Sequence, residues 1–498
     1  MKHVIIIVYA YLIELVRKLL MLHPNLIQLI FLPGISKIRI FNASARAYYE
    51  FHKAKRNVPA YKKFLKSKNF NYPDFKGLVP QINQIPIIDK DNYVKLYSLE
   101  ERCVSGSLPD SGLVIDESSG SSGLPTNWVR GEKERDRNAK FIKFGIKKLF
   151  GKEPLFIINA FALGAWATGM NITMSCLPFA KVKSLGPDID KIKNTINQFG
   201  KNHKYLIMGY PPFLKFFADQ AEVNFQEYNI SFIFGGEPMS EGMRDYLLKQ
   251  GVKRIYSSYG ASDLELNISS ENPFTISLRR LIRENKDLKN QLIKFSGALP
   301  MIFQYNPSDF LIETNNNNEL ITTICRPDYI APKVRYNIHD KGTIMPYQDI
   351  VKIIKNLNLQ DKIRWSKTDL PVLFHYGRSN MTVSFYGSNI SPTDIQDSLF
   401  RVSELAKIIN SYFLDVEENS SGDKKLKIYF ELMENIDKEL DVEKLGKLFF
   451  DALAETNQDF RKSKQMINDD SKTKLVFCEF NTSHFAKNDI RIKAKYIN

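Results

Sequence analysis

The sequence predicts an α/β fold, in which a large N-terminal domain with mainly parallel sheets and helices precedes a small α+β C-terminal domain. In the middle of the chain, apolar segments alternate with turns and helices, an order typical of parallel sheets. After about Tyr376, short strands surround one long helix from about Val442 to Arg461. Since 498 residues suffice for more than one domain, we divide the chain into an N-terminal helical segment (1–50), the large domain (51–377) and the small domain (378–498).

Three predicted strands form the centre of the large domain: Tyr205–Met208, Ile230–Phe234 and Val252–Ser257. A turn follows each strand, and Ser240 is a suitable N-cap for the helix after the second one. Ligands of parallel α/β sheets bind at the carboxyl ends of the strands. We therefore expect a binding site at the turns after these strands.

The composition is that of an ordinary globular protein, with 43% hydrophobic and 25% charged residues. The net charge of +15 favours anionic partners, namely nucleotides, anionic membranes or nucleic acid. No nucleic-acid-binding motif accompanies it, so we expect no nucleic-acid partner. The four cysteines are scattered, which argues against a zinc site and a disulfide framework and favours a cytoplasmic location.

Two apolar runs, Val4–Ile13 and Leu26–Leu32, lie near the N-terminus. Ten apolar residues are too few to span a bilayer. Two interpretations stay open. The runs form helices packed on the main body, or they form an interfacial anchor with basic flanks, which would give peripheral membrane contact through residues 4–32.

A segment rich in serine and glycine, Glu117–Thr126, lies between the predicted strands Leu113–Ile115 and Trp128–Val129. Glycines let backbone N–H groups approach a ligand, and serines add hydroxyl donors, so that together they can bind phosphate oxygens. The alternative is a flexible linker. The expected phosphate-binding residues are Ser119, Gly120, Ser121, Ser122, Gly123 and Thr126.

This segment resembles the phosphate loop of the adenylate-forming superfamily, which includes acyl-CoA synthetases, luciferases and nonribosomal adenylation domains. Threonine at position 126, where lysine is common, resembles the phenylacetate–CoA ligase branch. Four further motifs follow in the family's order. The first, Phe234–Met243, resembles G-[AG]-E-P-x-[ST]-E-x-M and implies that Gly236, Glu237 and Pro238 pack on adenine.

The second motif, Tyr259–Asp263, resembles Y-G-x-[TS]-E. The resemblance implies that Tyr259 and Gly260 bind adenine, that Ser262 contacts phosphate as a catalytic residue, and that Asp263 holds Mg²⁺. Asp263 stands where glutamate is usual. Glu265 lies two residues on and is the alternative metal ligand.

The third motif, Tyr336–Asp340, resembles Y-R-T-G-D and implies that Asp340 binds the ribose hydroxyls, a task that suits a carboxylate because it accepts two hydrogen bonds. His339 replaces glycine there, which we interpret as a local substitution. The fourth, Gly377–Asn380, resembles G-R-x-D. It implies a catalytic Arg378 facing ribose and phosphate, and a hinge at Asn380 before a mobile C-terminal lid.

The resemblance also implies a catalytic lysine on the lid that reaches the α-phosphate and the acyl carboxylate. The family's lysine lies in a glycine-containing turn, but no glycine occurs in residues 485–496. Lys487, Arg491 and Lys493 are candidates. The alternation of Ile490 and Ile492 favours a strand, and we choose Lys493.

Two other segments have open interpretations. Asn159–Gly169 mixes aromatic and small residues, which either form a buried core helix or line an acyl pocket through Phe161, Gly164, Trp166 and Gly169. Arg279–Lys294 is expected to be a solvated amphipathic helix.

The resemblance implies an enzyme that uses ATP and Mg²⁺ to convert a small-molecule carboxylic acid into its acyl-AMP, with release of pyrophosphate. The acyl group then passes to a thiol, for which CoA is the expected co-substrate. A carrier-protein thiol or an amine is the alternative acceptor. The departures at Asp263, His339 and Asn380 keep a non-catalytic nucleotide-binding protein of the same fold as the second hypothesis.

Overall fold

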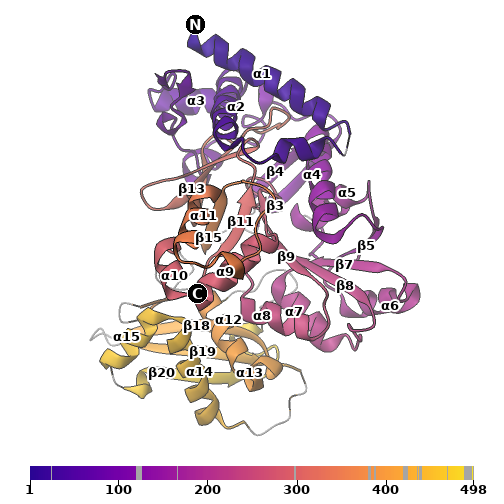
Figure 1. The fold of residues 1–498 in the computed structure, drawn as a ribbon, viewed down its shortest axis with the longest axis vertical. Coiled ribbons are helices and arrows are strands. Elements are labelled where there is room, and N and C mark those ends of the chain that lie inside the picture. The colour runs from indigo at the N-terminus through magenta and orange to yellow at the C-terminus, as the bar shows by residue number, and fades with distance from the viewer. Residues whose placement is uncertain are drawn as a thin grey trace.

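The computed structural model describes residues 1–23, 25–118, 126–164, 167–295, 299–378, 383–385, 388–418, 424–434, 436, 440–467, 469–486 and 496. Figure 1 shows the N-terminal helices at one end of the molecule, the large sheet in the middle and the C-terminal region, in yellow, at the other end. This order in space follows the order of the sequence.

A long mixed sheet forms the body, with the strand order β12-β13-β14-β15-β11-β10-β9-β8-β7-β5-β6. Its strands are β5 (Leu155–Asn159), β6 (Lys181–Ser184), β7 (Lys204–Gly209), β8 (Asn229–Phe234), β9 (Ile255–Tyr259), β10 (Ser269–Ser270), β11 (Met301–Tyr305), β12 (Phe310–Thr314), β13 (Glu319–Ile324), β14 (Tyr336–Met345) and β15 (Val372–Arg378). The half from β9 to β6 is parallel, and the half from β9 to β12 is antiparallel. Hence the expected parallel sheet is continued by antiparallel strands.

Helices surround this sheet, and the hairpin pairs β1 (Phe75–Lys76) with β2 (Val79–Pro80) and β3 (Leu113–Ser118) with β4 (Thr126–Gly131) lie outside it. The helices are α1 (Lys2–Leu20), α2 (Ser36–Asn57), α3 (Pro59–Ser67), α4 (Glu132–Phe150), α5 (Ala167–Cys176), α6 (Ile189–Phe199), α7 (Pro211–Gln220), α8 (Glu241–Lys249), α9 (Pro273–Glu284), α10 (Lys286–Leu292) and α11 (Tyr347–Asn356). Short helical turns include η1 (Ile27–Phe31) and η3 (Lys90–Val94).

Alternate side chains of each strand point to opposite faces of the sheet. Helices cover both faces of the parallel half, so both sets of side chains are buried. On β7, Leu206 and Met208 pack with α4 and α5, whereas Tyr205 and Ile207 belong to the cluster that contains α6, α7 and α8. The predicted strands correspond to β7, β8 and β9, and Ser240 caps α8 by accepting from the Met243 N–H at 3.1 Å. The third strand starts at Ile255, three residues later than expected, and includes Tyr259.

The C-terminal region has its own sheet, ordered β18-β19-β20, and its own cluster of buried apolar residues. Its elements are β16 (Val383–Phe385), β17 (Ser388–Ile390), α12 (Pro392–Arg401), α13 (Ser403–Ile408), β18 (Ile409–Glu418), β19 (Lys424–Leu432), α14 (Val442–Thr456), α15 (Gln458–Ile467) and β20 (Thr473–Cys478). The division of the chain at residues 50 and 377 stays a prediction.

Two sequence predictions about helices are corrected. The single helix expected over Val442–Arg461 is broken at Asn457, whose backbone is extended and whose buried side chain accepts the N–H of Phe460 at 2.9 Å and so starts α15. The segment Arg279–Lys294 is divided between α9 and α10. It is not simply solvated, because Arg279 is buried and paired with Glu241.

The N-terminal segment is packed on the body through charged side chains. Glu14 of α1 accepts hydrogen bonds from Arg46, at 2.7 Å, and from Arg137, while Arg17 pairs with Asp309 at 2.5 Å. All of these side chains are buried. Among the described residues, no helix is both long and apolar enough to cross a membrane.

The Glu14 ion pairs give the first prediction. In a Glu14→Gln variant, Arg46 and Arg137 stay buried but lose a charged partner, so the free energy of unfolding should fall by about 3–5 kcal/mol. Urea unfolding monitored by circular dichroism measures this change. Glu101→Gln is the control, because Glu101 pairs with Lys63 at the exposed surface, where ion pairs contribute little. Equal stabilities of the two variants would contradict the structural role of Glu14.

Candidate active site

A cavity of about 690 Å³ lies at the carboxyl ends of β8 and β9, where the large sheet meets the C-terminal region. The turn after β8, the segment at the end of β9 and residues of β14, β15 and α12 line it. Eight of the residues that the sequence predicts at a nucleotide site lie around this one cavity: Gly236, Glu237, Pro238, Tyr259, Gly260, Ser262, Asp263 and Asp340.

Asp340 is held by an aromatic pair on the cavity wall. The hydroxyl of Tyr259 donates to its Oδ2 at 2.8 Å, and His375 Nε2 lies 3.1 Å from the same oxygen. The rings of Tyr259 and His375 are 4.4 Å apart. The strands β14 and β15 bring Asp340 opposite Arg378 in the register. His375 was missed by the sequence analysis, although it lies three residues before Arg378 on the strand next to Asp340.

Asp263 lines the cavity, whereas Glu265 does not. Asp263 accepts from the hydroxyl of Tyr336 at 3.0 Å and lies 3.4 Å from Lys90 Nζ. Glu265 is buried and accepts from the hydroxyl of Tyr329, with Arg326 at 3.4 Å. The carboxylate of Glu265 therefore binds side chains in the protein interior. Asp263, at the cavity wall, is the better placed of the two to contact a ligand.

These groups fit an Mg²⁺ ion that arrives with a nucleotide. Such an ion is usually bound by one or two carboxylates together with substrate phosphates, and Asp263 supplies a carboxylate at the cavity wall. A second amine, Lys333, is close enough to Asp263 to interact with its charge. Burial and the charge of Arg102 lower the pKa of Lys333 to about 7, while Asp263 opposes this change. An anion arriving beside Lys333 would favour its charged form.

The turn after β8 needs glycine because its backbone is tightly enclosed. Gly236 has a φ of +81°, and a Cβ at this position would lie 2.5 Å from the ring of Tyr210. Next to it, Glu237 accepts from the hydroxyl of Tyr496 at 2.9 Å, and Tyr496 stacks on Tyr412. Residues of the C-terminal region thus contact the turn directly. No motif in the sequence indicated these two tyrosines.

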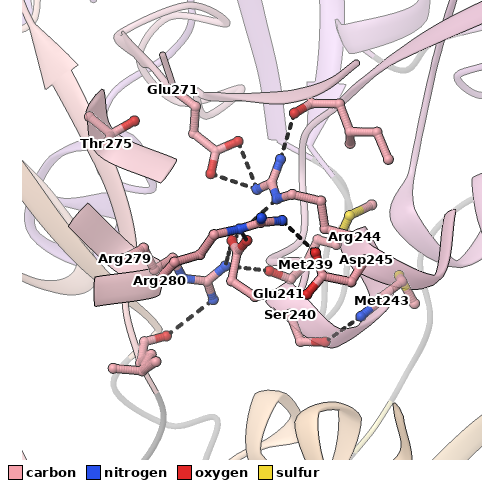
Figure 2. Close-up of polar contacts among 12 residues, drawn as sticks. Met239, Ser240, Glu241, Met243, Arg244, Asp245, Glu271, Thr275, Arg279 and Arg280 are labelled. Carbon is pink, nitrogen blue, oxygen red and sulfur yellow. Dashed lines mark hydrogen bonds and ion pairs between the residues drawn. The ribbon is translucent and has the colours of Figure 1, made fainter. Parts of the chain in front are cut away.

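Figure 2 shows the buried charges that hold this turn in place. Glu241, at the start of α8, accepts from Arg279 and Arg280 at 2.9 Å and from Arg244 at 3.2 Å. Arg279 also donates to the carbonyl of Met239 at 2.7 Å. Burial alone would raise the pKa of Glu241, but the charges of the arginines lower it to about 2. The cluster therefore connects α8, α9 and the end of the turn.

Comparison with known proteins identifies the fold. No model of a protein family and no curated protein matches the sequence. A 2-hydroxyisobutyryl-CoA ligase in the postadenylation state, in complex with R3-HIB-AMP, matches in structure with a TM-score of 0.66 and 12% identity, covering 94% of this chain and 90% of that one. The chain has the fold of the AMP-forming acyl-CoA ligases.

The match differs between structures of this ligase. The same ligase in the thioesterification state matches with a TM-score of only 0.53, at 13% identity, although it covers 93% of this chain and 90% of that one. Contacts between the C-terminal region and the rest of the molecule include three hydrogen bonds. The Ser240 N–H donates to Gln396 at 2.6 Å, and Lys215 donates to the carbonyl of Ile409 at 3.0 Å. The third is the bond from the hydroxyl of Tyr496 to Glu237.

Several predicted site residues lie outside the described residues, and their roles stay predictions: Ser119, Gly120, Ser121, Ser122, Gly123, Trp166, Asn380 and Lys493. Thr126 begins β4, paired with Ser118, and is not in the cavity lining. Only the backbone of Arg378 is described.

The predicted acyl-pocket residues are only partly brought together. Phe161 lines the cavity, along with Thr168, Ile172 and Met208. Gly164 is exposed and Gly169 packs against the carbonyl of Ala162, so neither reaches it. The segment therefore supplies both a cavity wall and a packed helix.

A second prediction follows from the Glu241 cluster. Because the pKa of Glu241 is about 2 in the folded protein and its ordinary value is 4.5, its charge stabilises the fold above about pH 4.5. This stabilisation disappears as the pH falls towards 2. Glu241→Gln should lose about 3 kcal/mol of unfolding free energy at neutral pH, and its deficit relative to wild type should shrink on acidification.

Urea unfolding at a series of pH values measures this difference. Lys63 pairs with Glu101 at the surface, and Lys63→Gln serves as the control, whose pH dependence should stay close to that of wild type because an exposed ion pair contributes little. A deficit of Glu241→Gln that stays constant between neutral and acidic pH would contradict the assignment.

Proposed function

We propose that the protein is an ATP-dependent acid–thiol ligase that forms AMP. The observation that supports this most strongly is the gathering of Tyr259, Asp263 and Asp340 around one cavity in a chain with the acyl-CoA ligase fold. Their sequence motifs were recognised independently of the fold. An aromatic ring, a metal-binding carboxylate and a second carboxylate match the adenine, phosphates and ribose of ATP, respectively.

In the first half-reaction, a carboxylate oxygen of the acid attacks the α-phosphorus of ATP, and the bond to the β-phosphate oxygen breaks with release of pyrophosphate. The protein acts by positioning and charge neutralisation. Asp340 orients the ribose, and Tyr259 stacks on the adenine beside the turn at Gly236. Lys90 places positive charge near Asp263, where the phosphates would lie, and arriving phosphates would favour the charged form of Lys333. Mg²⁺, when bound at Asp263, would neutralise further phosphate charge.

In the second half-reaction, a thiol sulfur attacks the acyl carbon, AMP leaves and the thiol proton passes to solvent. We propose CoA as the thiol, with a carrier protein or an amine as the alternative acceptor. Ser262, Arg378 and Lys493 are proposed as the catalytic contacts to phosphate and acyl oxygens, and Asn380 as the hinge. The phosphate loop is proposed to bind the phosphates of ATP, as its motif implies, and Trp166 to line the acyl pocket, as the composition of its segment suggests.

The cavity wall supports an acid with an apolar body. Phe161, Ile172, Met208 and Ile233 line the part of the cavity next to α5, and apolar walls of this kind select apolar ligands. Cys103, Cys176, Cys325 and Cys478 are free thiols, which supports a reducing, cytoplasmic setting.

Adenylation itself is the third prediction. With ATP and Mg²⁺, the protein should activate an acid from a panel of aryl, fatty and amino acids, detected by hydroxylamine trapping of the acyl-AMP. Asp340→Asn should weaken ATP binding because it removes the carboxylate expected at the ribose. Folded protein that binds ATP but neither traps an acyl group nor exchanges pyrophosphate with any acid would favour the non-catalytic alternative.

The metal ligand provides the fourth prediction. Asp263→Asn should lower the rate of adenylation by about a hundredfold or more, because it removes charge that positions the metal and phosphates. Glu265→Gln is the matched control. It changes a buried carboxylate outside the cavity, so it should reduce stability while the folded fraction keeps its rate. A larger rate loss in Glu265→Gln than in Asp263→Asn would reverse the assignment.

A further inference from the structure

The buried face of helix α1 holds two apolar and two charged residues, whereas most of its large apolar side chains are exposed. Its charged residues Glu14 and Arg17 point into the protein, where both are buried in ion pairs with Arg46, Arg137 and Asp309. A helix on a water-soluble surface normally turns its apolar stripe inward and its charges outward. The outward face of α1 is therefore the feature that needs an explanation.

This outward face is a continuous apolar stripe. Val8, Leu12, Val16 and Leu19 are 51%, 54%, 54% and 62% exposed and follow each other at helical spacing. Its remaining members on α1 are Val4, Ile5, Tyr11 and Leu15. The first 40 residues hold more of the exposed large apolar side chains than all the rest of the described chain.

The segment that follows the helix exposes four further leucines, Leu22, Leu26, Leu29 and Leu32. A contiguous apolar surface of this extent marks an interaction site, because exposure of so many apolar side chains to water is unfavourable. Exposed apolar residues and buried residues thus occur together in both α1 and η1.

The charges around the stripe are of one sign. Lys2 and Lys18 are exposed on α1, at opposite borders of the stripe by helical spacing, and Lys37 is exposed at the start of α2. Residues 1–73 contain two acidic residues, Glu14 and Glu50, and both are buried. The exposed surface of this region therefore carries positive charge without any acidic side chain.

We propose that α1 and η1 dock in the interfacial region of an anionic lipid bilayer. An apolar stripe bordered by lysines is the pattern of a helix that lies in the membrane plane, since the stripe enters the acyl boundary while the lysines reach the phosphates. A second copy of the chain fits less well, because pairing two stripes would bring the lysine borders of both copies together.

The position of α1 in the molecule is compatible with catalysis on such a surface. Figure 1 shows α1 at the end opposite the yellow C-terminal region, so docking leaves that region away from the bilayer. Phe31 of η1 also lines the active-site cavity and stacks on Phe144. The docked segment and the cavity are thus in direct contact, although none of the stripe residues of α1 lines the cavity.

Vesicle flotation tests the proposal with the full chain. Wild type should bind vesicles of phosphatidylcholine mixed with phosphatidylglycerol, more strongly at low than at high salt. A double variant, Leu12→Glu with Val16→Glu, should lose at least roughly tenfold of this binding. Its unfolding free energy and adenylation in vesicle-free buffer should match wild type, since both side chains are exposed.

The matched control places the same charges on other exposed leucines. Leu96 and Leu177 are 65% and 66% exposed, and the double variant Leu96→Glu with Leu177→Glu should float like wild type. Lys18→Gln should reduce binding to the anionic vesicles by about fivefold but leave binding to pure phosphatidylcholine unchanged.

Three results would overturn the proposal. The first is wild-type protein that fails to float with anionic vesicles, and the second is a Leu12/Val16 double variant that floats as well as wild type. The third is a wild-type dimer, seen by sedimentation in vesicle-free buffer, that dissociates in the Leu12/Val16 double variant. That result would assign the stripe to a second copy of the chain.

Discussion

The pairing of Glu241 with three arginines is the interaction on which the arrangement of the site depends. Because Glu241, Arg244 and Arg279 are buried, separating them would leave uncompensated charges in the interior, and α8 and α9 are therefore fixed to each other. Arg279 also binds the carbonyl of Met239, so the turn that carries Gly236 is fixed with them. The side of the cavity next to this turn is therefore positioned by Glu241, Arg244 and Arg279, none of which lines the cavity.

The same kind of interaction fixes the N-terminal segment. Hydrophobic burial is non-directional, and it would have turned the apolar side of α1 inward. The ion pairs of Glu14 and Arg17 instead turn these two charges inward, because that orientation gives Arg46 a carboxylate partner and Asp309 a further guanidinium partner. The exposed stripe is thus a consequence of where the buried charges lie, and the helix cannot rotate to hide it without unpairing them.

The sequence predicted what depends on local pattern. The strands β7 and β8 and the N-cap Ser240 were predicted because glycine turns and apolar segments report local structure, whereas Tyr259, Asp263 and Asp340 were chosen from the resemblance of their motifs to a known family. His375, Tyr412 and Tyr496 were not found, because their roles arise from strands and tails far apart in the chain. Arg279 was misjudged for a related reason: spacing within α9 cannot show that Glu241 lies opposite it.

Periodicity has a further limit that α1 makes plain. A stripe of apolar residues shows that a helix has an apolar neighbour, but it does not say whether that neighbour is protein or lipid. The position of Glu14 and Arg17 decides which face of the helix is turned inward, because buried partners for both charges lie on the protein side. The cavity then connects the two ends of the molecule: Phe31 of the N-terminal segment and Tyr496 of the C-terminal region line the same space. A change at either end can therefore reach the site through side chains that already touch it.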